Sequence, residues 1–117
     1  NTHRKLLKAL DDAISKTVST LDSLGIWDEV AIMTYSEFGR RAKENGARGT
    51  DHGTAAPHFL ISKNLGSGIV GGIPDLERLK NGDLQFQIDY RAMYNYVLSK
   101  NFALAANPFD KYGLPPV

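Results

Sequence analysis

Apolar side chains recur at steps of three and four residues through the first part of the chain, and this periodicity constrains the fold more than any other feature. They are Leu7, Leu10, Ile14, Val18, Leu21 and Leu24. Residues at this spacing fall on one face of an α-helix, which usually packs against a core. Asn1 or Thr2 can cap its start, and Gly25 is placed to end it in a left-handed conformation. We therefore predict a helix over residues 3–24.

A continuous apolar run follows this helix almost directly. Residues 30–35 read Val-Ala-Ile-Met-Thr-Tyr, without alternation of polar and apolar side chains, as is typical of a strand covered on both faces. Residues 57–62 form a second short apolar run. A helix followed by such a strand is half of a parallel α/β unit. The order of these elements predicts an α/β fold with a mostly parallel sheet.

The composition excludes several classes of protein. The chain has 117 residues, 14 Lys and Arg against 13 Asp and Glu, and no cysteine. Disulfides, thiolate metal sites and a thiol nucleophile are thereby excluded. A net charge of +1 argues against nucleic-acid binding, which needs many uncompensated cations. No apolar run approaches the roughly 18 residues of a membrane span, so residues 1–117 are expected to form a single globular domain.

Residues 36–54 interrupt the apolar pattern with glycines and charged side chains, and we predict a long functional loop here. Ligands of parallel α/β proteins collect at the carboxyl ends of the strands, and Glu37 lies just past the first predicted strand. Asp51 and His52 are adjacent between two glycines. Carboxylates and imidazoles bind divalent cations, so the three residues form a candidate site for zinc, manganese, calcium or magnesium. Alternatively, the carboxylates pair with neighbouring arginines and His52 hydrogen-bonds within a turn.

The same loop carries a local excess of positive charge. Arg40 and Arg48 are candidate substrate-binding residues, because a guanidinium can hold a phosphate or sulfate through two parallel hydrogen bonds. A small oxyanion ester is the substrate that this positive charge favours. The alternative is a charged loop that is simply solvated.

One dinucleotide-binding motif and one hydrolase motif are each matched only in part. Gly66, Gly68 and Gly71 fit G-x-G-x-x-G, but no long helical pattern begins there, as a dinucleotide site requires. Ser36 lies beside Glu37, yet neither glycine of the nucleophile elbow G-x-S-x-G is present around it. We reject both interpretations.

The second half of the chain contains fewer regular elements. A short helix through Leu76 and Leu79 is predicted, followed by a turn at residues 81–83, which read Asn-Gly-Asp. Asp89 is placed to cap a second clear helix. The Pro- and Gly-containing tail is expected to lie irregularly against the surface.

Four sequence segments resemble an uncharacterised bacterial family related to sulfatases and alkaline phosphatases. They read T-Y-S-E-F-G-R at residues 34–40, E-N-G at 44–46, T-D-H-G-T-A-A-P at 50–57 and D-Y-R at 89–91. The resemblance covers nearly the whole chain and implies the C-terminal portion of a larger alkaline-phosphatase-like domain, which would be part of a three-layer sandwich. It also implies export to the periplasm or beyond, since such chains commonly carry a twin-arginine signal.

The resemblance implies a metal-dependent hydrolase of phosphate or sulfate esters. Glu37 matches the strand-end place of an Asp-His ligand pair, and His52, with Asp51, resembles the ligand before the following strand. Phe38 stands where that pair would have its histidine, which puts one metal position in doubt. The nucleophile and further ligands are expected upstream of residue 1, so the chain alone is expected to be inactive.

Two alternatives remain at this point. The first concerns function: an exported protein that is not catalytic could keep the same scaffold for binding a carbohydrate or a cell-surface partner. The second concerns association: we expect a homodimer that pairs the exposed edges of the sheet or exchanges an element, with the first helix as the element that moves. The competing arrangement is a monomer whose tail, residues 102–117, covers the open edge of the sheet.

Overall fold

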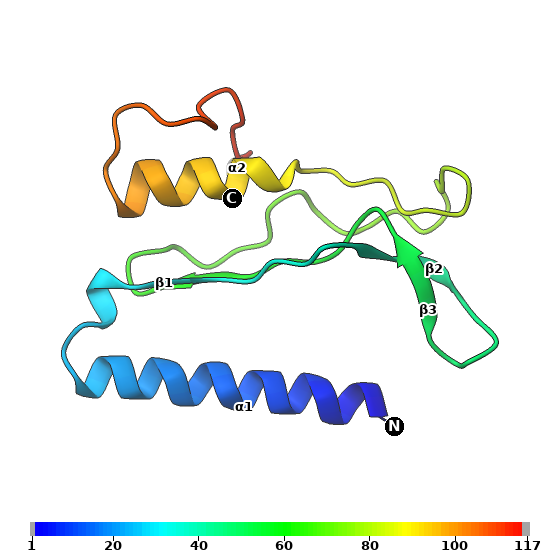
Figure 1. The fold of residues 1–117 in the computed structure, drawn as a ribbon, viewed down its shortest axis with the longest axis horizontal. Coiled ribbons are helices and arrows are strands. Elements are labelled where there is room, and N and C mark those ends of the chain that lie inside the picture. Colours follow the sequence, from blue (N-terminus) through cyan, green and yellow to red (C-terminus); the bar gives the residue numbers. More distant parts are fainter. Residues whose placement is uncertain (1, 116–117) are drawn as a thin grey trace.

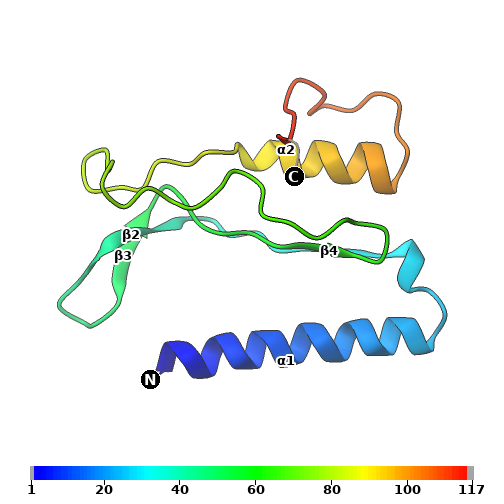
Figure 2. The ribbon, with the colours of Figure 1, turned by 180° about the vertical axis from the view of Figure 1, so that it is seen from behind.

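The computed structural model describes residues 2–115. Its elements are, in order, α1 (Thr2–Ser23), η1 (Trp27–Glu29), β1 (Ala31–Met33), β2 (Gly39–Glu44), β3 (Thr50–Gly53), β4 (Leu60–Ser62), α2 (Tyr90–Tyr96) and η2 (Val97–Asn101). Figure 1 shows the strands as a long ribbon, with α1 on one side and the helix formed by α2 and η2 on the other. The view from behind has the same order (Figure 2).

The strands form two antiparallel pairs. β1 pairs with β4, with Ala31 opposite Ser62 and Met33 opposite Leu60, and β2 pairs with β3. The predicted α/β three-layer sandwich with a mostly parallel, alkaline-phosphatase-like sheet is therefore wrong, and the chain is a small α+β domain. Parallel neighbours need a long crossover, usually a helix. Residues 34–59 contain a hairpin instead, which returns the chain in the opposite direction.

The two pairs continue one another along a single interrupted ribbon. Between them, the Thr34 amide donates to the Phe59 carbonyl at 3.0 Å, and the Phe59 amide donates to Thr34 Oγ1 at 2.8 Å. Farther along, the Arg40 amide donates to the Ala55 carbonyl at 3.0 Å. The predicted strands at residues 30–35 and 57–62 are thus confirmed as β1 and β4, whereas the predicted loop contains β2 and β3.

The first helix ends as predicted. Gly25 has φ +73°, and its amide donates to the Asp22 carbonyl at 2.9 Å, while the Ile26 amide donates to the Leu21 carbonyl at 3.1 Å. This paired arrangement is the Schellman ending, which favours glycine because of the positive φ. The apolar face of α1 behaves differently from the prediction: no residue of α1 is buried, so packing against a core is not found within residues 2–115.

The buried apolar core of the described residues is small. Trp27 in η1 is 8% exposed and Ala92 in α2 is 2% exposed. Many large apolar side chains stay accessible, including Leu10 at 44% and Ile73 at 85%. Among residues 2–115 no helix is both long and apolar enough to cross a membrane.

The second helix and the tail hold one another. Asp89 caps α2 by accepting from the Arg91 amide, which confirms the predicted cap. Asn95 Nδ2 donates to the Tyr112 carbonyl at 2.6 Å, and Asn107 Nδ2 donates to Asn95 Oδ1 at 2.8 Å. The tail is therefore fastened to α2, and through residue 115 it does not take the position over a sheet edge that the monomer alternative required.

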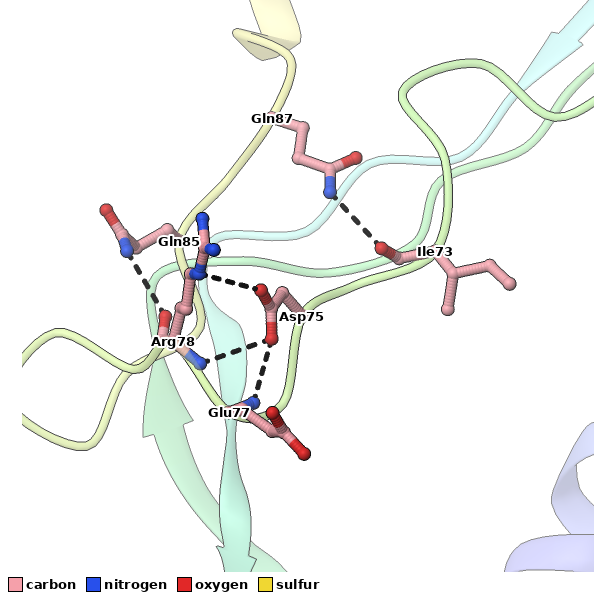
Figure 3. A network of polar contacts seen from close by, with 6 residues as sticks. All are labelled: Ile73, Asp75, Glu77, Arg78, Gln85 and Gln87. Carbon is pink, nitrogen blue, oxygen red and sulfur yellow. Dashed lines mark hydrogen bonds and ion pairs between the residues drawn. The ribbon is translucent and has the colours of Figure 1, made fainter.

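The segment between β4 and α2 is irregular and held by side-chain hydrogen bonds. Figure 3 shows the Asp75 carboxylate accepting from the amides of Glu77 and Arg78, at 2.9 and 3.2 Å, while Gln87 Nε2 donates to the Ile73 carbonyl. The short helix predicted through residues 76–79 is absent, because Asp75 closes a turn that is not continued. The turn predicted at residues 81–83 is confirmed, with mutual backbone hydrogen bonds between Lys80 and Asp83.

Candidate functional site

The segments S-E-F-G-R (residues 36–40) and T-D-H-G-T-A-A-P (residues 50–57) meet across the β2–β3 hairpin. Arg40 lies directly opposite His52, and Gly39 lies opposite Gly53. A Cβ on Gly39 would fall 2.1 Å from the Ala55 carbonyl oxygen, and a Cβ on Gly53 would fall 2.7 Å from the Arg40 carbonyl carbon. Both positions therefore need glycine for the strands to approach. This close approach brings two segments separated in sequence into one surface.

One face of the hairpin carries an aromatic and cationic cluster. The rings of Phe38 and His52 stack with their centroids 3.5 Å apart and an interplanar angle of 13°. The Arg40 guanidinium carbon lies 5.2 Å from the centroid of the Phe38 ring, and Arg40 Nη1 donates to the Thr50 carbonyl at 2.8 Å. The hairpin thus presents a guanidinium and an imidazole side by side on an exposed surface.

Asp51 is held apart from this cluster. Successive side chains of a strand point to opposite faces, so Asp51 and His52 diverge in β3. The Asp51 carboxylate accepts from Asn45 Nδ2 at 2.9 Å, and Asn45 Oδ1 accepts from the amides of Ala47 and Gly49 at 3.0 Å. Asp51 therefore supports the hairpin tip, and the predicted arginine partners are replaced by an asparagine.

Glu37 and Arg48 have no side-chain partner within the described part of the chain. Both are exposed, and neither is joined by an ion pair or side-chain hydrogen bond. Arg48 adopts φ +60°, a left-handed conformation in the hairpin tip. Across residues 2–115, no three His, Asp or Glu side chains are grouped as a metal site.

A second loop is fastened to the other side of the hairpin. Arg41 Nε donates to the Asp83 carboxylate at 3.2 Å, and Arg41 Nη2 donates to the Asn81 carbonyl at 3.1 Å. Thr54 Oγ1 donates to the Leu84 carbonyl at 2.8 Å. These contacts join residues about 30–40 positions apart in the sequence, and the turn signal at residues 81–83 predicts the loop but not its partners.

A family model described as a protein of unknown function (DUF1501) matches residues 1–105, most of the 117 residues. The chain belongs to the DUF1501 family. Comparison with curated proteins and with solved structures gives no match. The matched range includes the whole β2–β3 hairpin. Because the DUF1501 description states no activity, the function of the hairpin has to be argued from its chemistry.

The most perturbed titratable pair of the DUF1501 chain lies outside the hairpin. Hydrogen bonds from the Arg91 side chain and amide lower the pKa of Asp89 from 3.8 to about 2. The same contacts raise the pKa of Arg91. The Arg91 guanidinium also covers the Tyr112 ring. Since both charges are paired with one another, this pair stabilises the start of α2 and offers no free acid or base.

A cavity of about 270 Å³ lies between η1, the turn after β4 and η2 of this DUF1501 member. Its lining includes Asp28, Glu29, Asn64, Tyr96 and Lys100. Charges of both signs line it, and no ion pair joins Lys100 to either carboxylate among the described residues. This mixture selects no ligand class, so the hairpin is the better candidate site.

Proposed function

We propose that the β2–β3 hairpin is part of the binding site of a metal-dependent hydrolase that acts on phosphate or sulfate esters. In this proposal His52, Glu37 and Asp51 are ligands of a divalent cation, and Arg40 and Arg48 bind the oxyanion of the substrate. The motif resemblance adds export to the periplasm or beyond. The physiological ester is not specified by these residues.

The observation that carries the proposal is the pairing of Arg40 with His52 across the hairpin. A guanidinium binds a tetrahedral oxyanion through two parallel hydrogen bonds. A neutral imidazole is a common ligand of zinc and related cations. The two groups side by side therefore suit an anionic ester whose oxygen is also bound to a metal ion.

The two carboxylates would contribute differently. The Glu37 carboxylate has no partner among residues 2–115, so it can turn toward a cation without breaking a contact there. Asp51 would have to exchange its hydrogen bond from Asn45 for the metal ion. A cation held by these side chains alone would be weakly bound, because Asp51 faces away from His52.

Calorimetric titration of the chain with zinc and with manganese tests the proposal. We expect weak binding that is lost in His52→Ala and retained in the control His58→Ala, because His58 belongs to neither strand of the hairpin. Aryl phosphates and aryl sulfates should be hydrolysed only by a longer protein that includes this chain. Absence of metal binding by the chain, together with no hydrolysis by the longer protein, would favour the alternative of a binding or scaffold protein that is not catalytic.

We also propose that the chain pairs with a second copy through α1. An antiparallel arrangement centred on Ile14 places Leu7 opposite Leu21 of the other copy. It also places Leu10 opposite Val18, so apolar side chains of the two copies face one another. The apolar face available for this contact is unburied in the described chain, which supports association of two such helices.

A further inference from the structure

Phe38 lies against both the His52 imidazole and the Arg40 guanidinium of the hairpin cluster. Its ring lies parallel to the His52 imidazole, with the centroids 3.5 Å apart, and the Arg40 guanidinium lies over the same ring at 5.2 Å. Phe38 is also partly exposed, at 36%. It therefore touches both of the exposed groups that the proposed function uses.

The backbone around Phe38 is fixed on both sides. Ser36 Oγ donates to the Phe38 carbonyl at 2.7 Å. The next residue, Gly39, approaches Ala55 so closely that no Cβ fits, and the following amide, from Arg40, donates to the Ala55 carbonyl. The ring of Phe38 is thus attached to a defined backbone rather than to a freely rotating segment.

The stacking geometry restricts His52 without blocking its nitrogens. An exposed imidazole on a strand can rotate about both of its side-chain bonds. A ring lying flat against it removes that freedom. Stacking covers the face of the imidazole, whereas a metal ion or a hydrogen-bond acceptor meets a ring nitrogen at the edge, in the ring plane. The edge of His52 therefore remains available while its orientation is held.

We infer that Phe38 is a positioning residue, which holds the His52 imidazole in a single orientation for binding a divalent cation. This inference rests on the proposed function for its ligand. Its structural part, the orientation of the imidazole, is independent of any ligand. Residues that orient a metal-binding histidine commonly change affinity by about 10–100-fold when they are lost.

The test compares Phe38→Leu, which removes the aromatic ring, with Phe38→Tyr, which keeps it. In the unmodified chain without metal, proton NMR should show ring contacts between Phe38 and His52 and upfield-shifted His52 ring protons. We expect Phe38→Leu to abolish that shift and to weaken zinc binding roughly 10-fold. Phe38→Tyr should preserve both. Phe59→Leu is the matched control, since Phe59 is an exposed aromatic residue without ring stacking among the described residues.

The outcomes separate this inference from the proposed function. Absence of ring contacts in the unmodified chain overturns the inference, even if a variant fails to fold. If Phe38→Leu moves the His52 resonances but leaves zinc affinity unchanged, the positioning role is wrong and the proposed function stands. If the unmodified chain binds no zinc, the proposed function fails, and the resonances still decide whether Phe38 orients the imidazole.

Discussion

Arg91 lies over the ring of Tyr112, with its guanidinium carbon 4.1 Å from the centroid of the ring. The same guanidinium donates from Nε to the Asp89 carboxylate at 2.8 Å. A residue of the first turn of α2 is thereby joined both to its own capping carboxylate and to the tail. The cation–π contact with Tyr112 holds the tail, and the hydrogen bonds with Asp89 hold the start of α2. Loss of the Arg91 side chain should therefore destabilise both segments.

Acid should weaken this junction. The pKa of Asp89 is about 2 in the folded chain, below its ordinary value of 3.8. A carboxylate with a lowered pKa stabilises the fold above its unfolded pKa, and that contribution is lost as the pH falls from about 4 to about 2. Urea midpoints measured across this range should fall less steeply in Asp89→Asn. The exposed Asp11 provides the control, and an Asp11→Asn variant should keep the slope of the unmodified chain.

Close approach of the strands makes Gly53 sensitive to substitution. In Gly53→Ala the new methyl would lie 2.7–2.9 Å from backbone atoms of Arg40 and Arg41, so we expect a loss of about 1–3 kcal/mol in the free energy of unfolding. The matched variant is Gly46→Ala, where a Cβ meets nothing within 4 Å. Chemical denaturation compares the two. Equal stability of both variants would contradict the observed pairing of Gly39 with Gly53.

Backbone strain and anion binding can be separated at Arg48. Its φ of +60° is unfavourable for a side chain with a Cβ, by roughly 1–2 kcal/mol relative to the right-handed region. Arg48→Gly relieves that strain and also removes the guanidinium. We expect a stability that is unchanged or higher by up to about 1 kcal/mol, with weaker phosphate binding in an anion titration. Unchanged phosphate affinity would remove Arg48 from the proposed substrate site.

The tail should come loose when Asn107 is lost. Asn107 Nδ2 donates to Asn95 Oδ1, and its own Oδ1 accepts from the Phe109 amide at 2.9 Å. Asn107→Ala breaks both bonds, which are worth about 1 kcal/mol each. Hydrogen exchange of residues 107–114 should then accelerate, while exchange in β2 and β3 stays the same. Asn101→Ala, at an exposed asparagine, should leave exchange in the tail unaltered.

Association through α1 predicts a concentration-dependent mass. Light scattering across a dilution series should rise from 12.9 kDa toward twice that value. Leu10→Glu places a charge on the apolar face and should keep the chain monomeric, because an unpaired charge opposes burial of that face. Ala9→Glu, on the opposite side of the helix, should still associate. A mass that stays at 12.9 kDa at high concentration would refute pairing.

Local signals in the sequence predicted the elements that local chemistry controls. The apolar spacing and Gly25 define α1, and Asp89 defines the start of α2, because caps and helix periodicity act within a few residues. The apolar runs at β1 and β4 were also identifiable. Their relative direction was not, since it depends on the segment between them. β2 reads Gly-Arg-Arg-Ala-Lys-Glu, and a strand with so few apolar side chains has no hydrophobic alternation to reveal it.

The sequence predicted which residues belong to the site but not how their side chains are arranged. Asp51 and His52 are adjacent in sequence, which indicated a shared function, yet a strand directs neighbouring side chains to opposite faces. The stacking of Phe38 on His52 depends on the register that places Arg40 opposite His52. A shift of one residue in that register would reverse the faces, and nothing in the local sequence specifies it.

The β2–β3 pair lies between β1 and β4 in the sequence, and this order bears on how the chain folds. The β2–β3 hairpin closes a short loop, whereas β1 and β4 are far apart in sequence and enclose it. The entropy lost on closing a loop grows with its length, so the inner hairpin should form first. Once formed, the hairpin brings Met33 and Leu60 near one another, so less chain entropy has to be lost when β1 pairs with β4. The glycines at positions 39 and 53, which allow the inner strands to meet, therefore also control how fast the outer strands find each other.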